Sequence, residues 1–191
     1  MGKNSRIIIG IASLILILTY VFPLWKIQLM APQYPEGLGL KIWINTIDGQ
    51  NKGDLAKVNN LNHYIGMKEI VPDAIPELKI MPYLIGFMIL FGLIISLTGK
   101  RFLLISWVVL FILLMVAGLV DFYLWGYDYG HNLNPDAAIK IPGMTYQPPL
   151  IGSKKLLNFR AISLPDIGGW IIFLSILLGA IVMVYGFSKK E

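Results

Sequence analysis

Two histidines and several methionines are the residues of this chain best suited to bind a metal. His63 and Met67 are four residues apart, a spacing that places both side chains on one face of a helix. His131 and Met144 follow in a later polar segment, and Met30 comes shortly after the first apolar run. Imidazole and thioether ligands together favour copper, above all the cuprous ion. We therefore predict a soft-metal site in which His63 and Met67 supply the first half and His131, Met144 or Met30 complete it.

A structural role accounts for the same residues more simply. His63 can hydrogen-bond to a loop carbonyl and Met67 can fill a core, and a His–Met pair at this spacing is a weak motif. The chain has no cysteine, which excludes disulfides, thiolate metal sites and c-type haem attachment. If the five residues are ligands, they must converge in space. If they are structural, they will be separated, and an exposed apolar or aromatic patch will serve binding instead.

Catalytic signatures are missing from the sequence. There is no Walker loop, no HExxH and no G-x-S-x-G. Asp128 and His131 could form an acid–base pair, but they lie in a Gly- and Asn-rich turn, where such side chains usually serve the backbone. Asp121, at the end of an apolar run, is either a functional group or an acid with a partner such as Arg160. We therefore expect a protein that is not an enzyme.

Four long apolar runs must position these residues. They cover residues 7–25, 81–97, 102–124 and 168–187, and each is long enough for a helix to cross a hydrocarbon core about 30 Å thick. We therefore expect an α-helical membrane protein with four transmembrane helices in contact with a lipid bilayer. The first run starts like a signal peptide, but its length favours an uncleaved anchor.

The basic residues that flank these runs are concentrated on one side of the predicted membrane. Those that flank the runs on one side are Lys3, Arg6, Lys100, Arg101, Lys189 and Lys190. The positive-inside rule places this side, with both termini, in the cytoplasm. The two long connections then lie outside, and they are nearly neutral, with ten basic and nine acidic residues. The net charge of +5 is therefore a topology signal and gives no support to nucleic-acid binding.

The two connections are expected to form a small α+β cap. The chain divides into residues 1–25, 26–80, 81–124, 125–167 and 168–191, of which the second and fourth are the connections. Alternating apolar residues predict a strand at 38–45, and Asp54 is a good N-cap for a helix over 55–67. Short strands are expected at 138–141 and 155–162. This mixture of elements and turns favours an ordered unit in which both connections pack together.

Four runs of the chain resemble a small family of bacterial membrane proteins. They are APQYP at 31–35, LNHYIGM at 61–67, DYGHNL at 128–133 and PGMTYQPP at 142–149. The family is associated with the gene clusters for nitrous oxide reductase, a periplasmic copper enzyme of denitrification. The resemblance implies an inner-membrane accessory protein, with a periplasmic cap, that assists copper supply to such an enzyme or its maturation. A structural or docking subunit without a metal site is the alternative.

Overall fold

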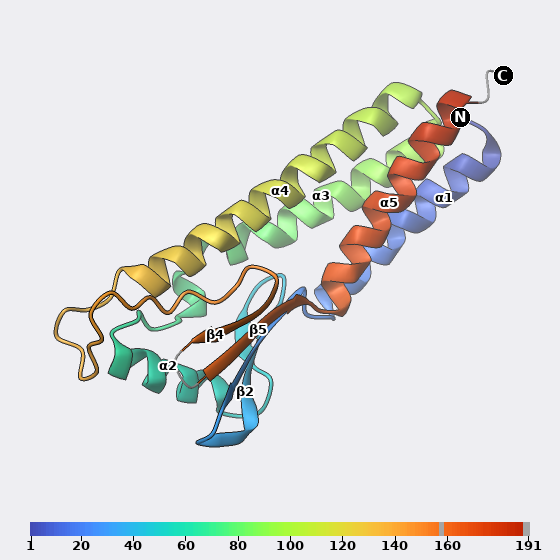
Figure 1. The fold of residues 1–191 in the computed structure, drawn as a ribbon. Helices are drawn as coiled ribbons and strands as arrows, with labels where there is room; N and C mark the ends of the chain where they lie inside the picture. Colours follow the sequence, from blue (N-terminus) through green and yellow to red (C-terminus); the bar gives the residue numbers. More distant parts are fainter. Residues whose placement is uncertain (157–158, 189–191) are drawn as a thin grey trace.

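The apolar runs form a bundle of helices that carries a β-sheet at one end (Figure 1). The computed structural model describes residues 1–156 and 159–188. The bundle consists of α1 (Lys3–Leu14) with the 3-10 helix η1 (Ile15–Tyr20), α3 (Pro76–Thr98), α4 (Arg101–His131) and α5 (Ile167–Ser188). In the described part of the chain, four helices are long and apolar enough to cross a membrane, as expected. The N-terminus, the α3–α4 turn and the end of α5 lie together, at the end of the bundle away from the sheet.

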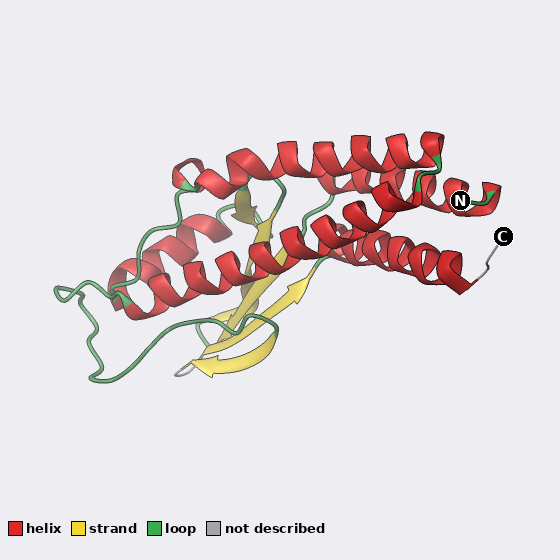
Figure 2. Ribbon diagram, turned by 90° about the horizontal axis from the view of Figure 1, so that it is seen from above, coloured by secondary structure: helices red, strands yellow, loops and turns green. Residues whose placement is uncertain are grey.

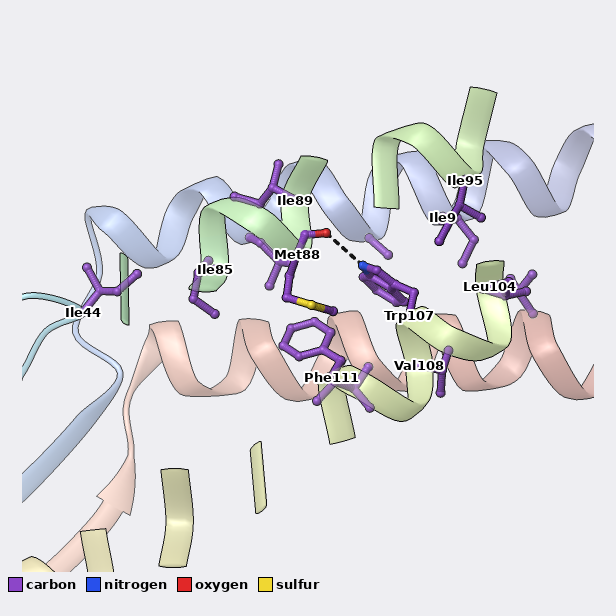
Figure 3. Packing of buried hydrophobic residues seen from close by; sticks show 14 of the residues in the cluster. Ile9, Ile44, Ile85, Met88, Ile89, Ile95, Leu104, Trp107, Val108 and Phe111 are labelled. Carbon is purple, nitrogen blue, oxygen red and sulfur yellow. Dashed lines mark hydrogen bonds between the residues drawn. The ribbon is translucent and has the colours of Figure 1, made fainter. Parts of the chain in front are cut away.

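The bundle core is centred on aromatic residues of α4 (Figure 3). Trp107 and Phe111 are fully buried, and their rings meet edge to face with centroids 5.3 Å apart. The indole Nε1 of Trp107 donates a hydrogen bond of 2.8 Å to the backbone carbonyl of Met88 in α3. This bond satisfies the one polar atom of the largest buried side chain and fixes α4 against α3.

Small residues let α1 and α3 approach closely. A Cβ atom added to Gly92 would lie 1.9 Å from the Ser13 hydroxyl, and one added to Gly10 would lie 2.9 Å from the Ser96 hydroxyl. The end of α3 is held by Arg6, whose Nε donates to the Ser96 carbonyl at 2.7 Å and whose guanidinium also donates to the Leu97 carbonyl. A cation at a helix C-terminus donates hydrogen bonds to the free carbonyls there and interacts favourably with the negative end of the helix dipole. Arg6 therefore has a structural role at the basic end of the bundle.

Five antiparallel strands make one sheet in the order β3-β2-β1-β5-β4. The strands are β1 (Trp25–Ala31), β2 (Tyr34–Ile42), β3 (Ile47–Gly49), β4 (Gly152–Leu156) and β5 (Phe159–Pro165). The central strand β1 pairs with β5 from Trp25 with Pro165 to Met30 with Arg160. Since β1 comes from the first long connection and β5 from the second, the expectation that both connections pack together is confirmed.

One face of the sheet, the inner face, packs on helices. Its side chains, among them Ile27, Leu40 and Ile47, are buried with Val58 of α2 (Asp54–Ile65). The end of α4 closes the same core, where the rings of Trp25 and Phe122 meet edge to face at 5.5 Å. We call the sheet, α2, η2 (Pro72–Ala74), the last turns of α4 and the loop 132–151 the head (Figure 2).

The other face, the open face, is not covered by any described helix. Strand alternation places ten side chains on it: Lys26, Gln28, Met30, Lys41, Asp48, Ser153, Lys155, Arg160, Ile162 and Leu164. Most of these are exposed or half-buried, whereas their neighbours Trp25, Ile27 and Ala161 are buried. The sheet is therefore amphipathic, with the polar face turned to the surroundings.

Several expected boundaries are wrong. The first apolar run is helical only to Tyr20, because Trp25, Ile27 and Leu29 are the inner-face residues of β1. Trp25 is thus a core residue, and its indole Nε1 donates to Ser163 at 2.8 Å.

The third run continues as helix to His131 instead of ending at 124. Residues 138–141 form no strand. The strand expected at 155–162 falls on the end of β4 and the start of β5, and its residues 157 and 158 lie outside the described residues.

Asp54 is not an N-cap. The cap position belongs to Gly53, and Asp54 is the first residue of α2, with its side chain only 2% exposed. Its Oδ2 accepts hydrogen bonds from the backbone N–H groups of Gly39 and Asn51 and from the Asn51 side chain, at 3.1–3.2 Å. Burial raises the pKa of this carboxyl, but these bonds and the nearby Lys57 outweigh burial, so the pKa lies below its ordinary value. Asp54 therefore joins β2, the turn and α2 as a buried carboxylate.

Candidate functional site

The residues singled out in the sequence gather around a junction in the head. We call it the joint: the end of α2 with residues 66–68, the last turn of α4, and the loop 132–151 that runs past both (Figure 2). Backbone hydrogen bonds hold it, from Asn134 N–H to the Gly66 carbonyl at 2.8 Å and from Ile139 N–H to the Tyr64 carbonyl at 2.9 Å. A third, of 2.9 Å, runs from Tyr146 N–H to the Gly130 carbonyl. The loop is therefore ordered by the two helix ends.

Two glycines make this close approach possible. Gly66 has a positive φ of 82° and ends α2, and a Cβ there would lie 2.9 Å from the Ala137 side chain. A Cβ on Gly130 would lie 2.3 Å from the backbone nitrogen of Gln147. Both positions belong to the runs that carry the family resemblance. Loop packing is thus a physical reason for the glycine in LNHYIGM and in DYGHNL.

His63 and Met67 do not share a helical face. His63 is exposed on α2, and its ring lies edge-on to Tyr64 with centroids 6.0 Å apart. Helix α2 ends at Ile65, and Met67 follows the left-handed Gly66, with its N–H donating 2.8 Å to the Asn62 carbonyl. The expected i, i+4 geometry is therefore wrong, because the helix ends two residues before Met67.

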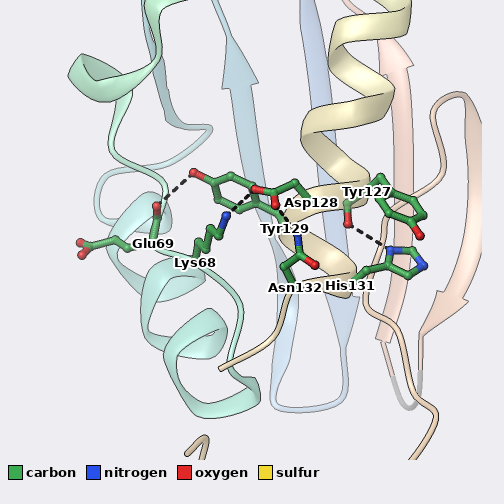
Figure 4. A network of polar contacts seen from close by, with 7 residues as sticks. All are labelled: Lys68, Glu69, Tyr127, Asp128, Tyr129, His131 and Asn132. Carbon is green, nitrogen blue, oxygen red and sulfur yellow. Dashed lines mark hydrogen bonds and ion pairs between the residues drawn. The ribbon is translucent and has the colours of Figure 1, made fainter. Parts of the chain in front are cut away.

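His131 belongs to the last turn of α4 and is turned away from α2 (Figure 4). Its ring stacks on Tyr127, with centroids 3.9 Å apart and planes at 15°. The Nδ1 atom lies 3.0 Å from the Tyr127 carbonyl and donates to it, which leaves Nε2 as the nitrogen with a lone pair. In the same view Lys68 reaches α4 from the opposite side. The side chain of His131 and the end of α2 therefore lie on different sides of α4.

Asp128 serves structure rather than pairing with His131. Its carboxylate accepts a hydrogen bond of 2.6 Å from Lys68 and another from the side chain of Asn132 (Figure 4). Tyr129 adds a bond of 3.2 Å from its hydroxyl to the Glu69 carbonyl. These contacts tie the segment after α2 to α4. They also replace the acid–base pair considered for Asp128 and His131, since each side chain has a different partner.

The two remaining methionines are in different places. Met144 is half-buried in the loop 132–151, where its N–H donates 3.1 Å to the Ile141 carbonyl. Met30 is 49% exposed on the open face of the sheet, next to Arg160 of β5. The sheet thus separates Met30 from α2 and the joint. Arg160 is on the open face as well, with its Nε bonded to Ser153 at 2.9 Å, so it is not the partner of Asp121.

The fit of copper to this arrangement is limited. Met67, His131 and Met144 lie in the three segments that meet at the joint, whereas Met30 is on the other side of the sheet and His131 is turned from α2. Within residues 1–156 and 159–188 no three His, Asp or Glu side chains are grouped as metal ligands. One centre holding all five predicted ligands does not fit this geometry, because metal–ligand bonds are only about 2.0–2.3 Å long.

Sequence reasoning missed an aromatic row that attaches α4 to the sheet. Phe122, Trp125 and Tyr129 lie on one side of α4, with ring centroids 6.1 Å and 4.4 Å apart in that order. All three pack on the core of the inner face. Their spacing of three and four residues is the helical signal that would have extended α4 beyond residue 124.

Comparisons with known proteins do not assign this chain. No protein-family model matches it, and no curated protein matches it either.

Proposed function

We propose that this chain is a membrane-anchored, non-enzymatic accessory protein whose head docks a protein outside the membrane. One observation carries the proposal: the head is attached to the bundle without flexible linkers. Only four residues lie between η1 and β1, Asp166 alone separates β5 from α5, and α4 runs unbroken into the head. A rigid platform with one sheet face open is suited to holding a partner at a fixed height and orientation.

The proposed orientation places the head in the periplasm of a bacterial inner membrane. Lys3, Arg6, Lys100 and Arg101 all belong to the end of the bundle opposite the sheet. The positive-inside rule supports a cytoplasmic location for that end. The bundle surface supports contact with lipid, since large apolar side chains such as Leu90, Leu113 and Val184 are more than half exposed.

Cross-linking in intact cell envelopes tests the docking function. A membrane-impermeant, lysine-reactive cross-linker is applied to envelopes that contain the tagged 21.4 kDa chain. We expect a discrete larger species that contains a second polypeptide. A chain that runs only as monomer or as a homo-oligomer under these conditions contradicts the proposal.

Copper handling is the second candidate function. It is supported by the family resemblance and by the meeting of the segments that carry Met67, His131 and Met144. Detergent-purified protein is analysed for copper with and without reducing agent. The candidate requires bound cuprous ion that falls in Met67→Leu and Met144→Leu, with Met30→Leu as the matched control on the other side of the sheet. Copper-free protein under reducing conditions, or equal loss in all three variants, contradicts it.

A further inference from the structure

Basic residues on the open face are placed directly opposite one another. Lys26 of β1 pairs in register with Lys41 of β2, and Lys155 of β4 pairs with Arg160 of β5. Residues opposed in this way have Cβ atoms about 4.5–5.5 Å apart, and like charges there are unfavourable. Two such pairs on one face are an arrangement that the isolated sheet does not stabilise.

The surroundings on this face neutralise these charges only in part. Asp48, which pairs with Lys41, is the one acid among the ten open-face side chains. Among the described residues, neither Lys26, Lys41, Lys155 nor Arg160 forms an ion pair. The ion pairs of the head, of Asp54 with Lys57 and of Asp128 with Lys68, involve α2, α4 and the segment after α2. The open face is therefore a basic surface.

Apolar side chains lie between the two pairs. Ile162 and Leu164 of β5 and Met30 of β1 are half-buried or exposed on the same face. Apolar contacts in the middle with charges around them are the usual composition of a protein-binding surface. Five strands of three to nine residues, about 4.8 Å apart with about 3.3 Å per residue, give a face of roughly 500 Å² in projection. That size corresponds to a small, transient interface rather than a permanent one.

The distance of the two basic pairs from the bundle decides whether the partner is a protein or a lipid surface. Strands β1 and β5 meet the bundle together, where β1 begins at Trp25 and β5 ends at Pro165, and the pair extends away from it (Figure 1). Lys26 is next to the bundle, whereas Arg160 pairs with Met30, four residues further along, about 13 Å away at 3.3 Å per residue. The headgroup layer on one side of a bilayer is only about 5–8 Å thick. A flat membrane surface therefore does not reach both pairs, but a protein standing beside the head does.

We propose that the open face is the docking surface of the head, and that it takes an acidic surface of a protein partner. The proposal rests on the docking function and adds the place and the chemistry of the contact. The partner places carboxylates against Lys26–Lys41 and Lys155–Arg160 and apolar groups against Ile162 and Met30. Such contacts speed association and weaken with salt, because exposed charges are screened.

Zero-length cross-linking tests this surface. A carbodiimide joins a lysine amine to a carboxylate only where the two are in contact, and mass spectrometry of full-length protein in native envelopes locates the bond. We expect links from Lys41 and Lys155 to Asp or Glu residues of a second polypeptide, reduced at least fivefold in 0.5 M NaCl. The variant Lys155→Glu/Arg160→Glu keeps a like-charge pair between β4 and β5, and it should reduce the Lys41 links at least fivefold.

Controls separate the possible failures. Lys52→Glu/Lys140→Glu makes the same change in charge at exposed positions away from the open face and should leave the Lys41 links unchanged. If the heteromeric complex persists equally in both variants, the open face is wrong while the docking function stands. If no heteromeric complex exists, the docking function itself fails. Salt-sensitive co-purification of phosphatidylglycerol in place of protein links, lost in Lys155→Glu/Arg160→Glu, assigns the face to lipid and overturns the proposal.

Discussion

At the scale of single residues, Asp54 shows how a buried carboxylate organises the head. It binds β2, the turn before α2 and α2 itself through three hydrogen bonds from Gly39 and Asn51. Buried charges are stable only when paired and hydrogen-bonded in this way. The sequence predicts Asp54 as the N-cap of α2. This prediction places the helix start within one residue of the observed start, but it assigns the wrong role to the Asp54 side chain.

We expect Asp54→Asn to destabilise the head by about 1–3 kcal/mol, since charged hydrogen bonds are lost from a buried site. The effect depends on pH. The folded-state pKa lies below the unfolded value of about 3.9, so the stabilisation is complete above that value and is lost as the pH falls through the folded pKa. Thermal unfolding of detergent-solubilised protein between pH 7 and pH 3 measures it. Asp48→Asn, at an exposed acid, is the control, and parallel pH curves for Asp54→Asn and wild type would falsify this role.

Gly130→Ala should release the loop 132–151 from α4. The added methyl group meets the Gln147 backbone, so the bond from Tyr146 N–H to the Gly130 carbonyl must break or the loop must move. We expect amide hydrogen exchange at Tyr146 to accelerate at least tenfold. Gly118→Ala, in the same helix with no atom within 4 Å of the new methyl, should leave exchange unchanged or stabilise α4. Unaltered protection at Tyr146 in Gly130→Ala would show that the glycine is not needed for docking.

The predicted ligands illustrate what residue spacing can and cannot foresee. The i, i+4 argument for His63 and Met67 assumed that α2 continues to Met67. Gly66 sits between them and ends the helix in a left-handed conformation, a common role of glycine that could have been read from the sequence. The orientation of His131 away from α2 depends on the rotation of α4 in the head, which no local pattern specifies.

At the scale of elements, the apolar helices were foreseeable and the sheet only in part. Helices α3 and α5 coincide with apolar runs, because a span without charges is a strong signal. Strand β1 was hidden, since its inner-face residues Trp25, Ile27 and Leu29 extend the hydrophobicity of the first run. Alternation with Lys26 and Gln28 is the feature that separates strand from helix there.

The contact of α1 with α3 gives a test at this scale. Gly92→Ala places a methyl group 1.9 Å from the Ser13 hydroxyl, so this hydroxyl must turn away from its bond to Ile9 or the helices must shift, and the bundle should lose about 1–3 kcal/mol of stability. Ser13→Gly combined with Gly92→Ala transfers the small residue to the other helix and should recover part of that loss. Thermal unfolding in detergent compares wild type, both single variants and the pair. Additive losses in the double variant would show that the two positions do not share a contact.

For the whole molecule, the prediction is that the head and the termini lie on opposite sides of the membrane. The natural chain has no cysteine, so each introduced cysteine is a unique probe. We expect an impermeant maleimide to label Lys52→Cys and Lys140→Cys in intact cells with a permeabilised outer membrane. Lys3→Cys and Lys100→Cys should react only after the inner membrane is opened. Labelling of Lys3→Cys in intact cells would contradict the predicted orientation or the predicted number of spans.

The pairing of β1 with β5 sets the order in which the molecule can be built. The indole of Trp25 and the hydroxyl of Ser163 are joined across 138 positions of the chain, so the middle of the sheet unites the beginning and the end of the polypeptide. A ribosome adding about 5–20 residues per second needs roughly 7–28 s to supply the second strand after the first. During that interval β1 has a free hydrogen-bonding edge, the kind of edge that pairs with other chains. The sheet is therefore completed only after β5 has been synthesised, and nascent chains stopped before residue 159 carry an incomplete, aggregation-prone half.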